Sequence, residues 1–374
     1  MRVAIVTESF LPQLNGVTNS VLQVLAHLER AGHEALVLAP GEPPASVHGA
    51  RVVPLRSVPL PGYSPVRLGV PTARAVAREL QAFRPDVVHL ASPFTTGGPA
   101  VRAAARCGVP VVAVYQTDVA GFAARYGWGP AAEAAWLRVR SIHEHADRTL
   151  APSRIAAADL AAHGVERVRL WPRGVDTGAF RPGHRDPLLH RRLAPGGEVL
   201  VGFVGRLAPE KQVEDLLALH DAPGLRLVVV GEGPEGASLR RRLPRATFTG
   251  QLTGDALSRT VATLDVAVQT GPFETFCQSA QEAMASAVPV VAVGAGGVAE
   301  LVDNSRTGWL YPPGDLAALR ARVLDLAGDE TKRRAMGGAA QRAVRSRTWP
   351  VVCEQLLGHY ADAMARNLAQ TAAR

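Results

Sequence analysis

The sequence alternates short β-rich runs with longer stretches of helical period, and it does so twice along its length. In the first half, runs rich in Val, Ile and Leu are separated by stretches rich in Ala, Leu and Arg, which is the pattern of βαβ units around a parallel sheet. The strands expected from this pattern are 2–7, 35–39, 52–55, 87–90, 109–115 and 148–151, and the expected helices are 20–32, 72–83, 99–108, 130–145 and 153–164. The first half therefore predicts one doubly wound α/β domain.

A turn-rich stretch then interrupts the alternation. It runs from Arg181-Pro-Gly-His-Arg-Asp-Pro187 to Ala194-Pro-Gly-Gly197, and we expect the interdomain linker there. Strands are expected again at 199–205, 225–231, 246–249, 265–269 and 288–293. Helices at 315–346 and 351–373 have no strand after them, and Trp349-Pro350 breaks the helical pattern between them. The sequence thus predicts two Rossmann-like domains, residues 1–190 and 197–346, with a C-terminal helix in 347–374 that packs back on the first domain.

The composition is that of an ordinary globular chain, with 47% hydrophobic and 20% charged residues. No stretch approaches the roughly 18 consecutive apolar residues that a membrane-spanning helix needs. The three cysteines, Cys107, Cys277 and Cys353, have the spacing of neither a disulfide framework nor a zinc site. We therefore expect no metal site and a reducing, cytoplasmic location.

The positive charge of the chain is diffuse. The formal net charge is +8; the first 189 residues hold 20 Arg against 14 acidic residues, and the rest of the chain holds 21 basic against 19 acidic residues. With only 5% aromatic residues, the chain offers few platforms on which bases stack, so we expect no nucleic-acid partner. An anionic acceptor or a peripheral contact at the inner face of the membrane fits the charge better. The sequence does not predict the oligomeric state.

The strongest motif follows the strand expected at 265–269 and leads into a helix. It reads Gly271-Pro-Phe-Glu-Thr-Phe-Cys-Gln-Ser-Ala-Gln-Glu282, which places Glu274 in the loop and Glu282 two turns into the helix. Glu274 at a helix start is compatible with a purely structural interaction with the helix dipole. The backbone N–H groups of residues 275–278 predict an anion site, most naturally for phosphate. Glu282 among apolar neighbours needs hydroxyl or cationic partners, such as a ribose diol, unless it lies on a solvated face.

A second motif, Gly205-Arg-Leu-Ala-Pro-Glu-Lys211, follows the first strand expected in the second domain. Ligands of open α/β sheets bind at the carboxyl ends of strands, where Gly205 permits the turn. Arg206 and Lys211 are then expected to reach one oxyanion, and the alternative is a salt bridge of these side chains with Glu210 or Glu214.

Two further glycine turns differ in their interpretation. Asn15-Gly16-Val17 follows the first strand of the chain and is another turn at a carboxyl sheet edge. Gly231-Glu-Gly-Pro-Glu-Gly236, with Asp255 further on, matches the dinucleotide pattern. That pattern belongs after the first strand of a domain, and acidic residues between these glycines repel a pyrophosphate, so we do not expect a nicotinamide dehydrogenase.

Taken in order, these motifs together with Arg173-Gly-Val-Asp176 resemble retaining glycosyltransferase family 4 over nearly the whole chain. The segments Tyr115 to Phe122 and Glu274 to Glu282 look most like actinobacterial GDP-mannose-dependent α-mannosyltransferases. The resemblance implies a GT-B fold, in which two Rossmann-like domains face each other across a cleft. It also implies transfer of a hexose, with mannose from GDP-mannose favoured, to a hydroxyl of a lipid, glycan or small molecule, with no metal and no cofactor besides the nucleotide-sugar substrate.

The resemblance also implies roles for individual residues. Arg206 and Lys211 bind the diphosphate, Glu274 the hydroxyls of the transferred sugar, Glu282 the ribose, and Gly16 lies near the donor phosphate and the acceptor. Gln116 stands where many relatives have His, so it either contacts the sugar or ties down the loop of Asp118. In the second case, Asp118 is the first candidate for the sugar contact. The remaining expected nucleotide contacts are Gly205, Gln251, Leu252, Thr275, Phe276, Cys277 and Gln278.

Other functions stay open at this point. A UDP-sugar-dependent transferase of the same fold and a nucleotide-sugar epimerase use the same double-Rossmann plan. A regulator that binds a sugar nucleotide without turnover is the non-enzymatic alternative.

Overall fold

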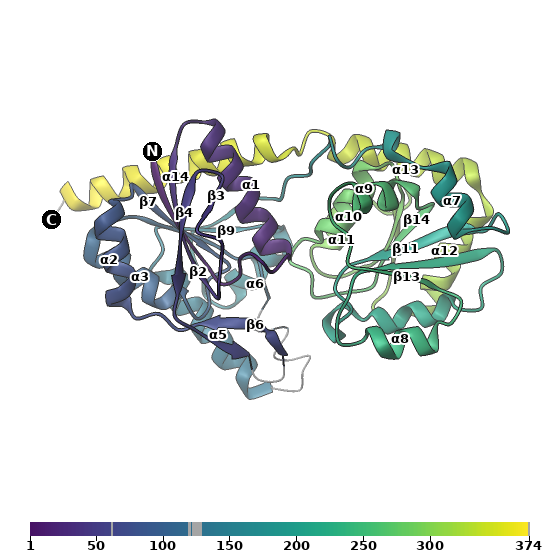
Figure 1. Ribbon diagram of the computed structural model, residues 1–374, viewed down its shortest axis with the longest axis horizontal. Helices are drawn as coiled ribbons and strands as arrows, with labels where there is room; N and C mark the ends of the chain where they lie inside the picture. The colour runs from purple at the N-terminus through teal and green to yellow at the C-terminus, as the bar shows by residue number, and fades with distance from the viewer. Residues whose placement is uncertain (61–62, 119–120, 122–128, 373–374) are drawn as a thin grey trace. The chain divides into compact units, whose positions relative to one another are not determined.

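The computed structural model describes residues 1–60, 63–118, 121 and 129–372 (Figure 1). The chain divides into two compact units. The first contains Met1–Arg173 together with the segment from Trp349, and the second is Gly174–Thr348.

The described residues of the first unit form an eight-stranded sheet in the order β10-β9-β8-β7-β1-β2-β4-β3, which is parallel except for the β3–β4 pair. A separate antiparallel hairpin joins β5 and β6. The strands are β1 (Arg2–Thr7), β2 (Glu34–Pro40), β3 (Ser46–Val47), β4 (Ala50–Leu55), β5 (Ser57–Leu60), β6 (Tyr63–Gly69), β7 (Val87–Ala91), β8 (Val111–Val114), β9 (Arg148–Ala151) and β10 (Val168–Leu170). The helices are α1 (Gly16–Arg30), α2 (Ala73–Phe83), α3 (Gly97–Cys107), α5 (Gly129–Glu144), α6 (Arg154–Ala162) and α14 (Trp349–Ala372).

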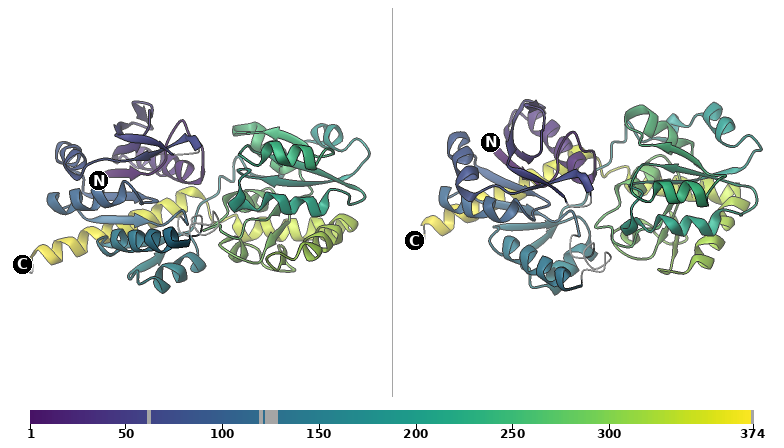
Figure 2. Two further views of the ribbon diagram at one scale, coloured as in Figure 1. Left: turned by 90° about the horizontal axis from the view of Figure 1, so that it is seen from below. Right: turned by 60° about the horizontal axis from the view of Figure 1, so that its bottom comes forward.

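Both faces of the central strands of this sheet are buried, which explains why these strands are continuous apolar runs rather than alternating ones. Val3 and Ile5 of β1 pack with residues of α1 and α14 on one face, whereas Ala4 and Val6 pack with residues of α2, α3 and α5 on the other. Tyr360 of α14 is fully buried in the first of these clusters. Figure 2 shows α14 in yellow along the purple-to-blue first unit. The C-terminal helix is therefore part of the core of this unit.

The described residues of the second unit form a six-stranded parallel sheet in the order β13-β12-β11-β14-β15-β16. One apolar cluster contains side chains from all of these strands and from the surrounding helices. The strands are β11 (Val199–Val204), β12 (Leu225–Val230), β13 (Thr247–Gly250), β14 (Val266–Gln269), β15 (Val290–Val293) and β16 (Gly308–Tyr311). The α-helices are α7 (Pro187–Leu193), α8 (Gly236–Arg242), α9 (Gly254–Thr263), α10 (Gln278–Ala285), α11 (Val298–Leu301), α12 (Leu316–Gly328) and α13 (Glu330–Val344), and the 3-10 helices are η1 (Pro182–His184), η2 (Pro209–Lys211) and η3 (Val213–Leu219).

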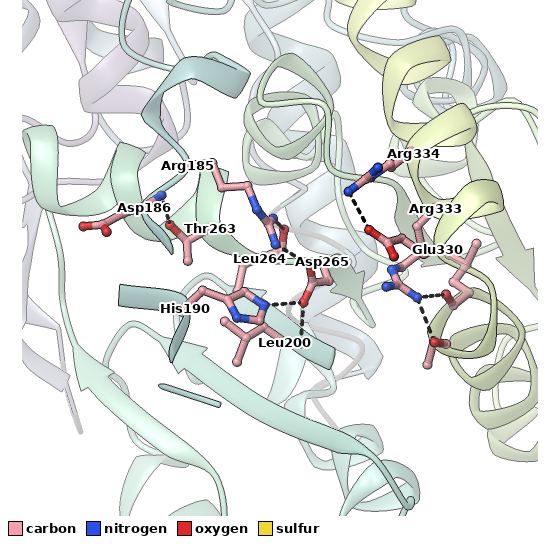
Figure 3. Close-up of polar contacts among 12 residues, drawn as sticks. Arg185, Asp186, His190, Leu200, Thr263, Leu264, Asp265, Glu330, Arg333 and Arg334 are labelled. Carbon is pink, nitrogen blue, oxygen red and sulfur yellow. Dashed lines mark hydrogen bonds and ion pairs between the residues drawn. The ribbon is translucent and has the colours of Figure 1, made fainter. Parts of the chain in front are cut away.

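The prediction of a linker at 181–197 is wrong, because this segment is packed into the second unit. Asp265, just before β14, accepts from Arg185 Nη2 at 2.6 Å and from the backbone N–H of Leu200 at 2.8 Å, and lies 2.8 Å from His190 Nε2 (Figure 3). Figure 3 also shows the Glu330–Arg334 ion pair on α13, at 2.6 Å. The unit boundary therefore lies at residue 173, before the expected domain end at 190, because residues 174–193 are held by core and polar contacts of the second unit.

Other differences from the sequence analysis lie at ends and edges. Helix α1 begins at Gly16 rather than at residue 20, because the Asn15 side chain accepts from the backbone N–H groups of Val17 and Thr18, both at 3.0 Å. The short strands β3, β5, β6, β10 and β16 were not predicted.

Candidate active site

The loops after β11, β14 and β15 converge in the second unit. The strand order reverses between β11 and β14, since β12 and β13 lie to one side of this pair and β15 and β16 to the other. Such a reversal separates the loops at the carboxyl ends of the two strands and leaves a ligand position between them. The motifs at 205–211 and 271–282 follow these two strands, so the fold brings the two predicted motifs together.

Lys211 and Glu274 form an ion pair that joins the two loops. The Thr270 hydroxyl donates to the Lys211 carbonyl oxygen at 2.6 Å, which ties the same loops through the backbone. Burial by itself lowers the pKa of Lys211, but the adjacent Glu274 carboxylate more than offsets this and holds the pKa above its ordinary value. Lys211 therefore keeps its positive charge at the point where the strand order reverses, between β11 and β14.

Arg206 forms an ion pair with Glu210, four residues along the same loop. The Glu210 side chain is 1% exposed, whereas that of Arg206 is 42% exposed. The salt bridge considered as an alternative for Arg206 is thus present. It fixes one side of the guanidinium, and the exposure of this side chain leaves it accessible to a ligand.

The glycines of the dinucleotide-like pattern have a structural role at this loop. Gly231 has a φ of 131°, and a Cβ at this position stands 2.0 Å from the Gly205 carbonyl oxygen. At Gly233 a Cβ stands 2.3 Å from the Leu207 carbonyl oxygen, and Leu207 exchanges backbone hydrogen bonds with Glu232 and Glu235, each at 2.9 Å. The pattern therefore reflects close packing against the Arg206 loop.

The segment from Thr275 to Gln278 leads into α10 as predicted. Phe276 and Cys277 are buried, Cys277 is left-handed with a φ of 76°, and Gln278 begins the helix. Burial raises the pKa of the Cys277 thiol to about 12, which leaves it neutral. The loop is held by the loop that follows β15, because the Gly297 N–H donates to the Glu274 carbonyl oxygen at 2.5 Å.

Glu282 lies on α10, eight positions after Glu274, and is partly buried. Desolvation raises the pKa of this carboxyl to about 8; Asp176 adds to the shift and a hydrogen bond with Gln278 opposes it. A carboxyl in this state gains from hydroxyl donors, which restore the solvation that burial removes.

Gln251 and Leu252 follow β13, the edge strand that β12 separates from β11. Gln251 is exposed, and Leu252 packs against the apolar core. Their neighbour Gly250 accepts from the Gly231 N–H at 2.9 Å, so they adjoin the glycine turn that supports the Arg206 loop.

In the first unit, Gly16 and Gln116 are joined by Arg173. Gly16 is the first residue of α1, and Gln116 lies just past β8. The Arg173 guanidinium donates to the Gly16 carbonyl oxygen and, at 3.1 Å, to Gln116 Oε1. Sequence reasoning gave Arg173 no role, although it stands in the Arg-Gly-Val-Asp motif.

Asp118 organises its own loop. It accepts from the Tyr115 hydroxyl at 3.2 Å and from the Gly121 N–H at 2.8 Å. Residues 119, 120 and 122 of the motif that starts at Tyr115 lie outside the described residues.

Glu8, which the sequence analysis did not single out, follows β1 and caps α3. Its Oε1 accepts from the Phe94, Thr96 and Gly97 N–H groups at 2.5, 2.8 and 3.3 Å and from the Thr96 hydroxyl at 2.8 Å, and its Oε2 accepts from the Thr95 hydroxyl at 2.7 Å. The sequence does contain a signal for this role, namely an acidic residue directly after a strand, because helix N-termini at a sheet edge attract carboxylates.

A cavity of about 250 Å³ opens beside the loop that follows Glu8. Its polar side chains include Glu42 and Arg67, and Arg67 is held by Ser57 through bonds of 3.0 and 3.1 Å. The cavity lining is Ser9, Phe10, Leu11, Pro12, Gln13, Pro40, Gly41, Glu42 and Arg67.

Within residues 1–60, 63–118, 121 and 129–372, no group of three or more His, Cys, Asp or Glu side chains is arranged to hold a metal ion. In the same part of the chain, no helix is long and apolar enough to cross a membrane.

Comparison with family models assigns both halves of the chain. Residues 14–179 match the model described as Glycosyltransferase Family 4, and residues 186–343 match the one described as Glycosyl transferases group 1.

Full-length relatives agree with these matches. The chain is 52% identical over 379 aligned residues to a GDP-mannose-dependent alpha-mannosyltransferase of Mycolicibacterium smegmatis, with 100% of both chains covered. A Mycobacterium tuberculosis protein of the same name is 49% identical over 100% of this chain and 99% of its own. Among solved structures, a sucrose-phosphate synthase from Thermosynechococcus elongatus aligns with a TM-score of 0.82 at 22% identity, over 98% of this chain and 99% of its own. The structural match confirms the predicted two-domain α/β fold of GT-B type.

Proposed function

The chain belongs to glycosyltransferase family 4, and from this premise we propose that it is a retaining transferase that moves mannose from GDP-mannose to a hydroxyl acceptor. The observation that carries the proposal is the full-length identity of 52% to a GDP-mannose-dependent alpha-mannosyltransferase. The nucleotide sugar is a substrate of this reaction and not a resident cofactor.

Lys211 and Arg206 stabilise the departing diphosphate. Breaking the sugar–phosphate bond concentrates negative charge on the phosphate oxygens, and preorganised cations at that position lower the barrier. Lys211 is suited to this role because its pairing with Glu274 keeps it charged in a partly buried place. Arg206 adds a fork of N–H donors from the neighbouring turn, with Gly205 as the turn itself.

Glu274 and Glu282 bind different parts of the donor, the sugar and the nucleoside respectively. Glu274 accepts hydroxyl donors of the transferred mannose next to Lys211, and Glu282, about one turn into α10, accepts the ribose diol. Further nucleotide contacts are assigned to Gln251, Leu252, Thr275, Phe276, Cys277 and Gln278.

The acceptor side of the reaction is assigned to the first unit. Gly16, Gln116 and Asp118 lie on loops at the carboxyl ends of β1 and β8, and the cavity beside Arg67 is the place assigned to the body of the acceptor. In a front-face mechanism, a leaving phosphate oxygen takes the proton of the acceptor hydroxyl while that hydroxyl oxygen bonds to the anomeric carbon on the same face. Configuration is thereby retained, and no side chain has to act as the base.

A peripheral membrane contact of the first unit accompanies this proposal. Three exposed apolar residues lie near the cavity: Leu14 directly follows its lining loop, Val58 lies in β5 and Val70 directly follows β6, at 48%, 43% and 42% exposure. The excess of Arg over acidic residues also lies in this half of the chain. A vesicle-binding assay tests this contact. The protein should bind vesicles that contain anionic lipid and should bind neutral vesicles more weakly. Absence of binding to both kinds of vesicle contradicts the membrane contact. The cytoplasmic location stays a prediction.

A panel of GDP-, UDP- and ADP-sugars tests the donor assignment. The wild-type protein is screened by thermal shift, and the nucleotide sugars that stabilise it are assayed for nucleotide release. GDP-mannose should give the largest shift and be turned over. Turnover of a UDP-sugar instead makes the chain a UDP-sugar-dependent transferase. Epimerised nucleotide sugar without a glycoside product, or binding without any turnover, contradicts the transferase assignment.

A further inference from the structure

Glu232 is an exposed acid at the carboxyl end of β12 to which the proposed function assigns no role. It follows Gly231 in the glycine turn, and its carbonyl oxygen accepts from the Leu207 N–H at 2.9 Å, which joins this turn to the loop of Arg206. In the sheet, β12 lies between β11 and β13. The Glu232 side chain therefore starts at the same sheet edge as the proposed diphosphate site, on the neighbouring strand.

The Glu232 carboxylate is directed toward β13. A Cβ added to Gly250, the last residue of β13, would stand 3.3 Å from Glu232 Oε1. In the sheet order, β13 and β14 lie on opposite sides of the β11–β12 pair, so the carboxylate is held on the side away from the loop of Glu274. A negative charge repels a diphosphate, but at this distance from the proposed phosphate site it faces the position left for the uncharged end of the nucleotide, its base.

No side chain neutralises this carboxylate. The two cations of the adjacent loop are paired with other acids, Arg206 with Glu210 and Lys211 with Glu274. In the part of the chain that the structure describes, the side chain of Glu232 has no hydrogen-bond or ion-pair partner. An ionised carboxylate only accepts hydrogen bonds, so a ligand group that it binds must supply donors.

The common bases differ in the donors that they offer to a carboxylate. Guanine presents N1–H and the N2 amino group side by side, which matches the two carboxylate oxygens. Uracil presents one N–H between two carbonyl oxygens, and these oxygens face a carboxylate unfavourably. Adenine presents an amino group beside a ring nitrogen that only accepts. Of these three bases, guanine is therefore the one that can make a pair of charge-assisted hydrogen bonds with Glu232.

We propose that Glu232 is the residue that selects guanine, by accepting hydrogen bonds from N1–H and the N2 amino group of the bound nucleotide. This inference rests on the proposed function, in which the donor is GDP-mannose, and deepens it by naming the side chain that distinguishes GDP from other nucleotides. It also explains why an acid stands in a glycine turn beside a phosphate site: the acid binds the other end of the nucleotide.

Inosine diphosphate isolates one of the two hydrogen bonds, because its base is guanine without the N2 amino group. In isothermal titration, wild-type protein should bind GDP about tenfold or more tighter than inosine diphosphate, since the carboxylate loses one donor. In Glu232→Gln, one carboxylate oxygen becomes an NH2 group, which cannot accept. GDP affinity of this variant should fall about tenfold or more and come close to its affinity for inosine diphosphate.

Two results of these titrations overturn the proposal. One is equal affinity of the wild-type protein for GDP and inosine diphosphate. The other is a GDP preference over inosine diphosphate that is the same in Glu232→Gln as in wild type. A loss of stability that weakened the whole site would lower both affinities alike, so the ratio of the two affinities separates base selection from a structural role.

Steady-state kinetics of Glu232→Gln provide a second measurement. The base lies apart from the bond that breaks, so its contacts are alike in the ground and transition states. Glu232→Gln should therefore raise the KM for GDP-mannose about tenfold or more and leave kcat near the wild-type value. A lower kcat with an unchanged KM contradicts a contact to the base.

Two other acids near this turn serve as controls. Glu235→Gln removes the same charge from the same turn, and it should keep the wild-type ratio of GDP to inosine diphosphate affinity. Asp255, in the first turn of α9, is the rival acid after β13. If Asp255→Asn abolishes the GDP preference and Glu232→Gln does not, the proposal is overturned. Wild-type protein that binds UDP in preference to GDP removes the proposed donor and this inference with it, whereas GDP-preferring wild-type protein with an unaffected Glu232→Gln variant removes the inference alone.

Discussion

Nucleotide binding by this chain should depend on pH through Glu282. Burial raises the pKa of this carboxyl to about 8 from its ordinary value of 4.5, so the free protein holds a proton there at neutral pH. A ribose diol donates two hydrogen bonds and favours the ionised form. Binding is therefore coupled to loss of the Glu282 proton, and Glu282→Gln removes the coupling.

The size of the effect follows from the pKa. At pH 7 about one molecule in ten has Glu282 ionised, so ionisation costs about 1.4 kcal/mol, or about tenfold in affinity, relative to pH well above 8. Each further decrease of one pH unit should lower the GDP affinity about another tenfold, until the pH reaches the pKa of Glu282 in the complex. At pH 7, nearly one proton should be released for each GDP bound.

The raised pKa of Glu282 affects folding stability in the opposite direction: GDP affinity rises with pH, whereas the free energy of unfolding falls. Because the folded protein holds this proton up to about pH 8 while the unfolded chain releases it near 4.5, Glu282 makes the free energy of unfolding fall as the pH rises through that window. Glu282→Gln lacks this fall, so the variant should melt higher than wild type at pH 8.5 and bind GDP more weakly there.

Isothermal titration with GDP from pH 6 to 9, in buffers with different ionisation enthalpies, measures both affinity and proton release. Titration of the nucleotide itself is common to both proteins and cancels in their difference. Glu330→Gln is the matched control, since Glu330 is an exposed acid on α13 whose side chain is 61% exposed. Equal pH dependence of GDP affinity in wild type and Glu282→Gln would show that Glu282 is not the group that loses a proton on binding.

Three further predictions concern the same unit. Lys211→Ala should fold normally and lower turnover at saturating donor by at least about tenfold, measured as GDP release; unchanged turnover removes the phosphate assignment. Glu274→Ala should chiefly lower kcat and Glu282→Ala should chiefly raise the donor KM, because ribose contacts are alike in ground and transition states; equal steady-state profiles contradict this division. Gly231→Ala should lower both the melting temperature and activity, because its Cβ falls 2.0 Å from a carbonyl oxygen of the Arg206 loop, whereas Gly183→Ala, with no atom within 4 Å of the added Cβ, should not; a normal melting curve for Gly231→Ala contradicts the packing role.

The central strands were predictable because both faces of each sheet are buried, which leaves continuous apolar runs in the sequence. β9 was predicted at its observed bounds, and β1 likewise. The short edge elements were not, because β3 and β10 contain too few residues for any period to appear. The linker prediction failed for a related reason: Pro and Gly mark turns, but they do not reveal that Asp265, far along the chain, binds Arg185 and holds the segment.

The site was predictable where sequence motifs coincide with strand ends. The two motifs were expected at the carboxyl ends of parallel strands, which share one edge of a sheet. Lys211 and Glu274 form an ion pair there, a contact that the sequence analysis did not predict. The partners of Arg173 were not predictable, because Gly16 and Gln116 both lie far away from it in the sequence. The pKa of Glu282 also depends on burial, which a helical period alone does not specify.

The most direct test of a retaining, GDP-mannose-dependent transferase uses water as the acceptor. Wild-type protein is incubated with GDP-mannose, and the anomeric proton of released mannose is followed by NMR before mutarotation proceeds. A retaining transferase should release GDP with α-mannose as the first sugar product, and the Lys211→Ala variant should release both more slowly. β-Mannose as the first product contradicts retention of configuration, and turnover of UDP-sugars with GDP-mannose left intact contradicts the assignment of GDP-mannose as the donor.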